Sequence, residues 1–571
     1  MRALIFSTII LLLLSLTQHN RNIPTFIDDG MTVGCGPAPR LSDLRADEQG
    51  SFAPALPGWG HYSYKVATGS DSAQFFFNQG LNLYYSYHLT EALASFKEAA
   101  RRDTACVMAY VGQALAMGPY YNSGSYKMPS AVLPVLERMD RLAIGITGKE
   151  KELVEVMKRR YTSDTADVRR KELNAAYAEG LAELVRKYPA DVDIKTLYVD
   201  AVMLEHAWDF WNNDGTPKPW TDELVAYCDD VLKTQPLHPA ALHYQIHLVE
   251  ASRHPESALH NADALQVTLP GVSHMVHMAS HMYQRNGLYA KGVAVNEQAS
   301  HLQGRYDSLA QNLKLGNFAL THFDGVGAFC ALNANMYGKA LQMSRHGHDI
   351  LASEKYKSRL SYTFFQYLYM LPVFADLRSG KWKELMDEPI PDSSLHFATL
   401  LDEFGKGMAC VRLHDGASAL RHLERLRVLS AYPELKVVTN PPFKAPIEEA
   451  RIAEDLLAGE IAFSEKRFDE AIHLLEAAVT REDALIYREP KEWPIPVRHY
   501  LGAHLLELGR AGEAEKVYRQ DQVFNPGNGW SQLGLYRCAI MQHKTKEMEK
   551  YKALYIAAFA DAEVLPTASA Y

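Results

Sequence analysis

The sequence predicts an all-α protein, an α-solenoid in which helix hairpins stack into a right-handed superhelix, and three observations support this fold class. From Ser72 onward, apolar residues recur every three or four positions, which is typical of amphipathic helices. No convincing alternating apolar and polar run, typical of strands, interrupts this pattern. At 571 residues the chain is too long for one compact core, so an extended repeat array is expected.

A repeated spacing identifies the type of hairpin. A tetratricopeptide (TPR) repeat has about 34 residues, with small residues where its two helices cross. The pattern occurs four times, at Gly80, Ala92, Phe96 and Ala99, at Ala258, Ala262, Leu265 and Pro270, at Gly459, Ala471, Leu475 and Ala478, and at Gly502, Ala514, Tyr518 and Pro526. Small residues allow the helices to approach closely, and each hairpin buries its apolar face on the next. The sequence therefore predicts a TPR-like array.

The array is expected to occupy only part of the chain. Residues 1–22 contain Arg2 and a short apolar run, which predicts a signal peptide or a short membrane anchor. Residues 23–70 are rich in Pro, Gly, Asp and Ser and read as an irregular leader or linker. The TPR-like array is expected at residues 71–565, with long inserted loops at Trp208–Trp220 and Glu482–Pro496. We therefore expect an exported protein, periplasmic or anchored facing the periplasm, with membrane contact only through its N-terminus.

Composition and motifs narrow the functional classes. The net charge is −9 and no long basic run is present, which disfavours nucleic acid as a partner. Six scattered cysteines form no CxxC pair, so neither a disulfide scaffold nor a thiolate zinc site is expected. The chain contains no HExxH, GxSxG or Walker A motif and no GxGxxG after a strand, so catalytic residues stay unknown.

Histidines cluster in the centre of the chain, at residues 238–285. Eight of the 23 histidines lie between residues 238 and 281, where composition alone would place about two. HxxxHxxE and HxxHxxxH spacings each put three side chains on one helix face, and a 34-residue offset superimposes His243 on His277 and His247 on His281. Because the first helices of neighbouring repeats pack roughly 10 Å apart, both triplets would face one volume in the concave groove. The candidate metal ligands are His243, His247, Glu250, His274, His277 and His281.

The chemistry of this set favours a transition metal. Five imidazoles and one carboxylate suit copper, zinc or iron, as one ion or two, and suit calcium or magnesium poorly. Tyr244, Tyr283 and Asn296 are candidates to support the ligands through hydrogen bonds. His206, His238, His254 and His260 lack the repeated register and are expected to be ordinary core or surface residues.

Several stretches carry a resemblance to a family of largely uncharacterised bacterial TPR-repeat proteins. They include FNQGLNLYYSYHLTEALASF (77–96), ALHYQIHLVEAS (241–252), GVSHMVHMASHMYQRNGLY (271–289) and YREPKEWPIPVRHYLGAHLLELGRAGEAEKVYR (487–519). The resemblance implies that the six candidate ligands belong to the family's HxxxHxxE and HxxHMxxHxY motifs, and it implies no reaction. A downstream His-Asn-x-His motif of that family keeps only His322 here, and Asp200 stands where relatives tend to have Glu.

Three functions are consistent with these patterns. The first is a metal-binding TPR-like protein that holds an ion between two repeats. The second is a metalloenzyme, an oxidase or hydrolase, in which the ion activates dioxygen or water and His or Glu250 acts as a base. The third is a scaffold without metal, whose groove binds a partner protein or peptide. The histidine register favours the first.

Overall fold

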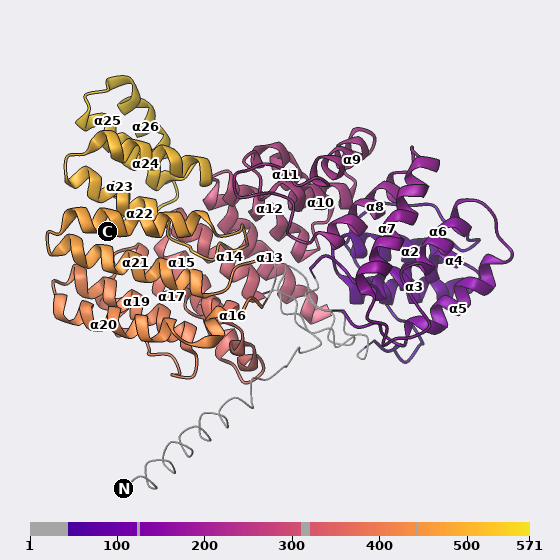
Figure 1. The fold of residues 1–571 in the computed structure, drawn as a ribbon. Helices are drawn as coiled ribbons and strands as arrows, with labels where there is room; N and C mark the ends of the chain where they lie inside the picture. The colour runs from indigo at the N-terminus through magenta and orange to yellow at the C-terminus, as the bar shows by residue number, and fades with distance from the viewer. Residues whose placement is uncertain (1–43, 123–125, 310–319, 440–441) are drawn as a thin grey trace, which may run out of the picture.

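The computed structural model describes residues 44–122, 126–309, 320–439 and 442–571, and their regular structure is helical (Figure 1). Within these ranges, pairing of extended backbone is limited to an isolated bridge between Trp211 and Pro217. The predicted all-α solenoid is confirmed. The expected signal peptide or anchor lies outside the described residues, and residues 44–70 form turns without a helix. No described helix combines the length and the apolar character needed to cross a membrane.

The first half of the array consists of helices that pack mainly on their neighbours in sequence. They are α2 (Asp71–Tyr85), α3 (Leu89–Arg102), α4 (Val107–Met117), α5 (Val132–Ala143), α6 (Lys149–Lys158), α7 (Arg170–Lys187), α8 (Val192–Glu205), α9 (Thr221–Thr234), α10 (Pro239–Val249), α11 (Leu259–Thr268), α12 (Ser273–Arg285) and α13 (Tyr289–Leu309). A short 3-10 helix, η2 (Pro255–Ala258), precedes α11. The residues between α8 and α9 form the first predicted long loop, which we call the 206–220 loop.

The second half continues the same stacking of hairpins. Its helices are α14 (Leu320–Asn333), α15 (Tyr337–Ala352), α16 (Thr363–Tyr369), α17 (Leu371–Arg378), α18 (Trp382–Asp387), α19 (His396–Arg412), α20 (Gly416–Ser430), α21 (Ile447–Ser464), α22 (Phe468–Asp483), α23 (Val497–Glu507), α24 (Ala511–Phe524), α25 (Gly529–Met541) and α26 (Thr545–Ala558). Two 3-10 helices, η4 (Lys357–Ser361) and η5 (Pro433–Lys436), lie in its connections. The residues between α22 and α23 form the second predicted loop, the 484–496 loop.

The glycines of the repeat pattern lie where helices cross. A Cβ atom added at Gly80 or at Gly112 would collide with the ring of Phe96 on α3. The same holds for Gly502 and Gly534, which both face the ring of Tyr518 on α24. In each case one aromatic side chain fills the space between the first helices of two successive hairpins. This is the packing that the TPR spacing predicts.

Two apolar cores follow each other along the array and meet at α13 and α14. The first core contains buried side chains from Ala53 to Phe323, and the second contains buried side chains from Tyr289 to Tyr551. Both helices contribute to both cores, so the two halves are joined by packed side chains. In Figure 1 the first half lies on the right and the second half rises on the left.

A second contact joins the halves near α12. The turn after α12 packs its backbone against the turn before α25, because a Cβ at Gly287 would lie 2.6 Å from the backbone of Gly527. Both glycines have positive φ angles, 71° and 72°, which residues with side chains adopt at a cost. Within the second half, Trp530 on α25 donates a 3.1 Å hydrogen bond to the carbonyl of Asn333 at the end of α14.

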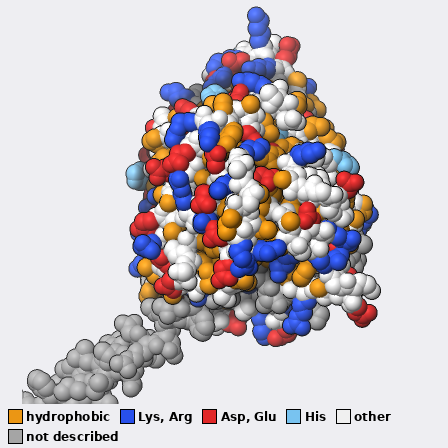
Figure 2. Space-filling model, turned by 90° about the vertical axis from the view of Figure 1, so that its right-hand side faces the viewer, with side chains coloured by type: hydrophobic (Ala, Val, Ile, Leu, Met, Phe, Trp, Pro, Cys, Tyr) orange, Lys and Arg blue, Asp and Glu red, His pale blue; other side chains and the backbone are white. Residues whose placement is uncertain are grey.

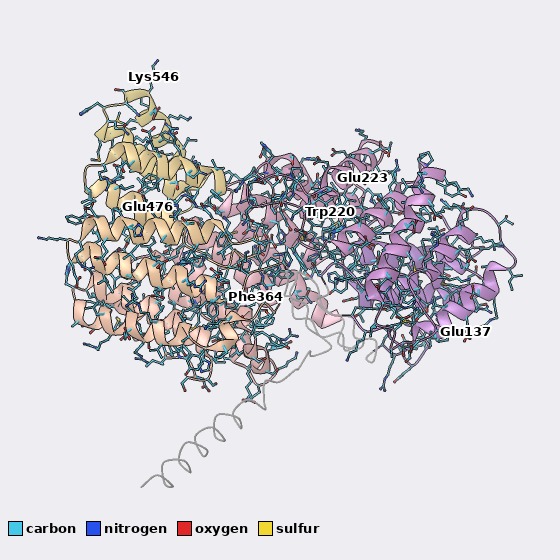
Figure 3. All side chains as sticks on the ribbon, viewed as in Figure 1. Glu137, Trp220, Glu223, Phe364, Glu476 and Lys546 are labelled. Atoms are coloured by element: carbon cyan, nitrogen blue, oxygen red, sulfur yellow. The ribbon has the colours of Figure 1, made fainter. Side chains whose placement is uncertain are left out.

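The outer surface carries charges of both signs. At the N-terminal end of the array, basic, acidic and apolar side chains are interspersed (Figure 2). Glu137, Glu223, Glu476 and Lys546 are exposed and project outward from helices of both halves (Figure 3).

Candidate metal centre

Helices α10 and α12 carry five of the six candidate ligands and pack against each other. Pro239 at the start of α10 needs no hydrogen-bond acceptor, and His238 caps this helix by accepting from the amide of Ala241 at 3.3 Å. Glu250 is the C-terminal cap residue of α10. The candidate side chains are buried, with exposed fractions of 0–2% for His243, His247, Glu250, His274, His277 and His281.

The structure corrects one expectation, that these side chains line an open concave groove. Aromatic residues after α2 and α4 cover the cluster: the ring of Tyr87 lies 4.6 Å from that of His243, and the ring of Tyr121 lies 5.0 Å from that of His247. From the second half, the 484–496 loop places Glu489 4.0 Å from Nδ1 of His281. The cluster is therefore an interior site, because segments distant in sequence close over that face of the array.

The imidazoles approach one another through their Nε2 atoms. Nε2 of His243 and Nε2 of His274 are 3.2 Å apart, and Nε2 of His277 and Nε2 of His281 are 3.0 Å apart. Two nitrogens that each lie roughly 2.1 Å from one ion are about 3.0–3.4 Å apart for the usual ligand angles. Both separations therefore match two ligands on a common metal ion, and they equally match an N–H···N hydrogen bond.

The opposite ring nitrogens are held by fixed partners. Nδ1 of His243 donates to the carbonyl of Tyr85 at 2.7 Å. Nδ1 of His277 donates to Oδ1 of Asn296 at 2.6 Å, and the Asn296 amide is oriented because its Nδ2 donates to the carbonyl of Gly292. These partners fix the proton on Nδ1, so Nε2 of both imidazoles carries a lone pair.

Glu250 holds two more imidazoles at once. Its Oε2 lies 2.7 Å from Nδ1 of His281, and its Oε1 lies 3.1 Å from Nδ1 of His247. With Glu250 ionised, both imidazoles donate to it, and the lone pairs of His277 and His281 face each other at 3.0 Å. A metal ion between the two Nε2 atoms would bind both lone pairs. Without metal, a protonated Glu250 can donate to Nδ1 of His281, and the proton of His281 then lies on Nε2 and is donated to His277. Burial raises the pKa of Glu250 well above its usual value, which favours the proton when metal is absent.

Two groups of three histidines result. The first trio is His243, His247 and His274, and the second trio is His277, His281 and His322, and the potential ligand atoms within each lie within 4.8 Å of one another. His322 comes from α14, with its ring 4.7 Å from that of His277. In the first trio, Nε2 of His247 and Nδ1 of His274 are buried without a hydrogen-bond partner. The predicted ligands thus come together, and Glu250 forms a third group of potential ligands with His247 and His281, between the two trios.

The surroundings keep the imidazoles neutral. Burial lowers the pKa of His247 to about 3 and that of His277 to about 4. Burial, followed by the neighbouring imidazoles, also lowers the pKa values of His243, His274, His281 and His322 well below the usual value. Neutral imidazole is the form that binds metal.

The supporting residues were foreseen only in part. Asn296 contacts His277 as expected, whereas Tyr283 bonds to Gln266 and Asp263 instead. Tyr244 is buried with its ring 5.5 Å from that of His243. Asp200 accepts a 2.6 Å hydrogen bond from Tyr84, away from the imidazole nitrogens.

Three further supports were missed: the Tyr85 carbonyl, Glu489 and Arg285. Arg285 donates to the carbonyl of Glu250 at 2.7 Å and to that of Ser252 at 2.8 Å, which fixes the end of α10. Arg285, Tyr85 and Glu489 all lie within the stretches quoted for the family resemblance, and this was the available signal.

Comparisons with known proteins add little to this picture. No family model matches the chain, and no curated protein matches it. A human IFIT1 dimer with m7Gppp-AAAA is 12% identical, with 87% of this chain and 92% of that chain covered and a TM-score of 0.31. Yeast Tom70 is 13% identical over 79% of this chain and 92% of its own, with a TM-score of 0.26. The P58(IPK) TPR domain is 14% identical over 79% of this chain and 99% of its own, with a TM-score of 0.18.

At these identities and TM-scores, nothing about the ligands of those proteins transfers to this chain. The class of protein rests on the chain's own structure: an all-helical TPR-like solenoid with a buried polyhistidine centre between its two halves. The expected membership in a bacterial family, and its motifs, stay predictions.

Proposed function

We propose that the protein binds two transition-metal ions, one in each histidine trio. The observation that carries the proposal is the 3.0 Å approach of Nε2 of His277 to Nε2 of His281, since with Glu250 ionised the partners of both Nδ1 atoms direct lone pairs toward each other. Two lone pairs at that distance repel unless a cation lies between them. An ion in the second trio removes this repulsion. An ion in the first trio would bind nitrogens that are buried there without a hydrogen-bond partner.

The ligand set favours copper or zinc. Three neutral imidazoles and an open position form a known zinc environment, and nitrogen ligands bind copper more tightly than zinc, iron or manganese. Glu250 was expected as a ligand. Because both oxygens of Glu250 face Nδ1 atoms, we assign it the role of orienting His247 and His281. Its negative charge would also offset the positive charge of the ions.

Metal analysis of protein purified without a histidine tag tests the proposal. We expect two equivalents of copper or zinc after loading and dialysis. His274→Ala and His322→Ala should each retain one equivalent, and the double variant His247→Ala/His281→Ala should retain none, with helix content unchanged by circular dichroism. His254→Ala provides a matched control, since its side chain is 82% exposed. Undiminished stoichiometry in the double variant, or no uptake by the native chain, would show that the trios bind no metal.

A metalloenzyme is the second candidate, and the three-ligand trios favour it because each leaves a coordination position open. The hydroxyl of Tyr244, near His243, is buried without a hydrogen-bond partner and is a candidate group to contact a metal-bound molecule. Azide added to the copper-loaded protein tests for an open position. A new charge-transfer absorption band is expected, and an unchanged spectrum would mean that the ions are fully coordinated and serve no such chemistry.

A further inference from the structure

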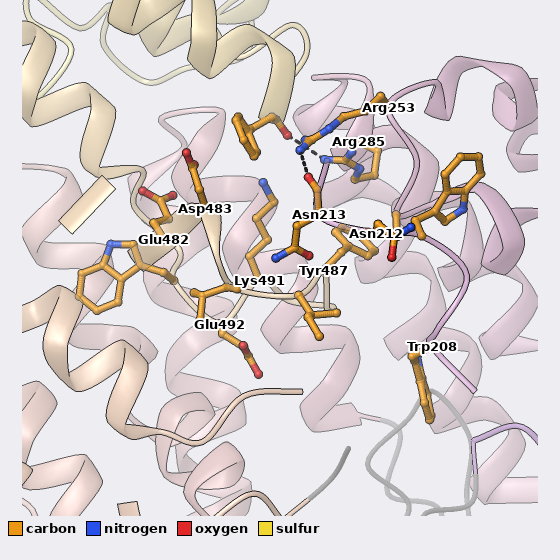
Figure 4. A pocket seen from close by; sticks show the side chains of 16 residues that line it. Trp208, Asn212, Asn213, Arg253, Arg285, Glu482, Asp483, Tyr487, Lys491 and Glu492 are labelled. Atoms are coloured by element: carbon orange, nitrogen blue, oxygen red, sulfur yellow. Dashed lines mark hydrogen bonds between the residues drawn. The ribbon is translucent and has the colours of Figure 1, made fainter. Parts of the chain in front are cut away.

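A pocket of about 100 Å³ lies beside the histidine centre, where the 206–220 loop meets the 484–496 loop (Figure 4). Ala251, which follows Glu250, lines the pocket, as does Arg285 at the end of α12. Cavities of roughly 150 Å³ hold a benzene molecule. The pocket is therefore large enough for one functional group of a small organic molecule, with the remainder extending toward its opening.

Three cationic side chains line this pocket: Arg253, Arg285 and Lys491. Arg253 donates to the carbonyl of Asn213 at 2.6 Å, and Arg285 also donates to the carbonyl of Phe524 at 2.8 Å, as Figure 4 shows. Lys491 donates to the side chain of Asn525, and in Figure 4 its ammonium group points toward the side where the two arginines lie. Among the described residues, these hydrogen bonds go to neutral oxygens, and carboxylates act on Arg253 and Lys491 only from beyond ion-pair distance.

Two of the carboxylates in the wall pair with arginines outside it, and the third accepts from a backbone amide. Asp483 accepts from both terminal nitrogens of Arg498, at 2.5 and 2.6 Å. Glu492 accepts from Arg488 at 3.2 Å, and Glu482 accepts from the amide of Val497 at 2.8 Å. Among the described residues, none of the three cations in the wall forms an ion pair with a carboxylate. Two of the three carboxylates in the wall are paired with arginines outside it, so the three cations of the wall face one carboxylate without an arginine partner, Glu482, and this excess of positive charge attracts an anion.

Aromatic rings support the cations and form the apolar part of the wall. The guanidinium of Arg253 lies 4.1 Å from the ring centre of Phe524, and that of Arg285 lies 5.1 Å from the ring centre of Tyr487. Trp208 lines another side of the pocket. Arg253 donates to Asn213 through one nitrogen and keeps its other N–H groups for a carboxylate. Arg285 uses all three nitrogens on backbone carbonyls and contributes mainly its charge. The indole offers a flat apolar surface to a planar body.

We propose that this pocket binds a small organic carboxylate with a planar apolar body, its carboxylate toward Arg253, Arg285 and Lys491. This function goes beyond metal binding and does not require it, because no imidazole lines the pocket. Arg285 connects the two sites, since it also holds the carbonyl of Glu250. The same chain thus has a metal centre and, next to it, a site for an anionic ligand.

Isothermal titration calorimetry with the full-length protein tests the pocket, with benzoate as the probe and benzyl alcohol as its neutral counterpart. We expect one benzoate per chain, with millimolar or tighter affinity, and at least tenfold weaker binding of benzyl alcohol. Lys491→Met keeps most of the side-chain stem and removes the charge, so it should weaken benzoate binding at least tenfold. If Lys491→Met does not fold, Arg253→Gln provides the same test, because Arg253 is only half-buried.

The control is Arg451→Gln, which removes an exposed arginine that pairs with Glu448 on α21. It should leave benzoate binding unchanged. The assignment is overturned if benzoate gives no binding heat at millimolar concentration, if benzyl alcohol binds equally well, or if Arg451→Gln has the same effect as Lys491→Met. Titration after removal of metal by a chelator should give the same affinity. Loss of binding there would instead mean that benzoate coordinates a metal in the trios, and would overturn the pocket assignment without affecting the metal proposal.

Discussion

Buried histidines in the two halves of the molecule satisfy their nitrogens in opposite ways. In the second half, Nε2 of His499 lies 3.2 Å from Asp521, and its Nδ1 accepts from Arg378 at 3.0 Å. Nε2 of His504 similarly lies 2.8 Å from Glu460. In the centre, by contrast, Nε2 atoms face other Nε2 atoms, and one carboxylate, Glu250, serves two imidazoles.

The carboxylates show the same contrast. Burial alone would raise the pKa of Asp521, but His499 and hydrogen bonds to Ser531 and Asn525 bring it down to about 2. Burial raises the pKa of Glu250 well above its usual value, and Arg285 opposes this only in part. A buried histidine with its own carboxylate stabilises the fold, whereas buried histidines whose lone pairs converge are suited to bind a cation. Burial by itself does not distinguish the two.

The largest effect on stability is expected from breaking the histidine–carboxylate pair of the second half. Asp521→Ala removes the acceptor of His499 and leaves buried polar groups unpaired, so the free energy of unfolding should fall by about 3–5 kcal/mol. Urea denaturation followed by circular dichroism measures this change. Glu476→Ala, an exposed carboxylate on α22, is the control and should change stability little. If folded Asp521→Ala keeps the native metal content, the pair of the second half serves stability and not metal binding. Equal stability of Asp521→Ala and Glu476→Ala would contradict this contrast between the two regions.

Acid should weaken the second half through the same carboxylates. Burial would raise the pKa of Glu460, yet Arg412 and His504 outweigh it, so both Glu460 and Asp521 have pKa values of about 2. Their folded pKa values lie below the usual values of 4.5 and 3.8, so their stabilisation is present above those values and is lost as pH falls toward 2. The loss is about 2–3 kcal/mol for each group. Urea midpoints at pH 5 and pH 3 measure about half of this loss, since pH 3 still lies above both folded pKa values. Asp521→Asn should show a shallower fall.

The smallest effect concerns one hydrogen bond in the centre. Asn296→Ala removes the acceptor that orients His277, and loss of such a partner weakens metal binding about 10–100-fold, or about 1.4–2.7 kcal/mol. Competition with a chelator of known affinity measures the change at the second trio. Asn286→Ala is the matched control, because Asn286 caps α12 through the carbonyl of Met282 and contacts no imidazole. Equal metal affinity in Asn296→Ala and the native chain would show that Asn296 does not position a ligand.

The sequence predicted the features that depend on local periodicity. Gly80 and Gly502 lie against Phe96 and Tyr518 as the repeat spacing requires, because the contact is set within one hairpin. The 34-residue offset between His247 and His281 brought both residues to the same carboxylate, Glu250. These relations follow from helix geometry and repeat length, which a sequence displays directly.

The covering of the site could not be predicted from periodicity. The acceptor for His243 is the backbone carbonyl of Tyr85, 158 positions earlier, and any residue type supplies such a carbonyl. Glu489 reaches His281 from an irregular loop, where no helical period relates the two positions. The sequence therefore indicated which side chains gather but gave no sign that segments of both halves would bury them.

The Arg285 side chain has a mechanical consequence. Open solenoids flex along their length because each repeat contacts only its neighbours. Arg285 spans 239 positions to the carbonyl of Phe524, and the backbones of Gly287 and Gly527 are in contact beside it. These contacts hold the middle of the array rigid, so bending is confined to its two ends. A rigid frame of this kind holds imidazoles at fixed separations, so for the proposed ions a difference in ionic radius would translate into strain, and the scaffold would favour the metal that fits.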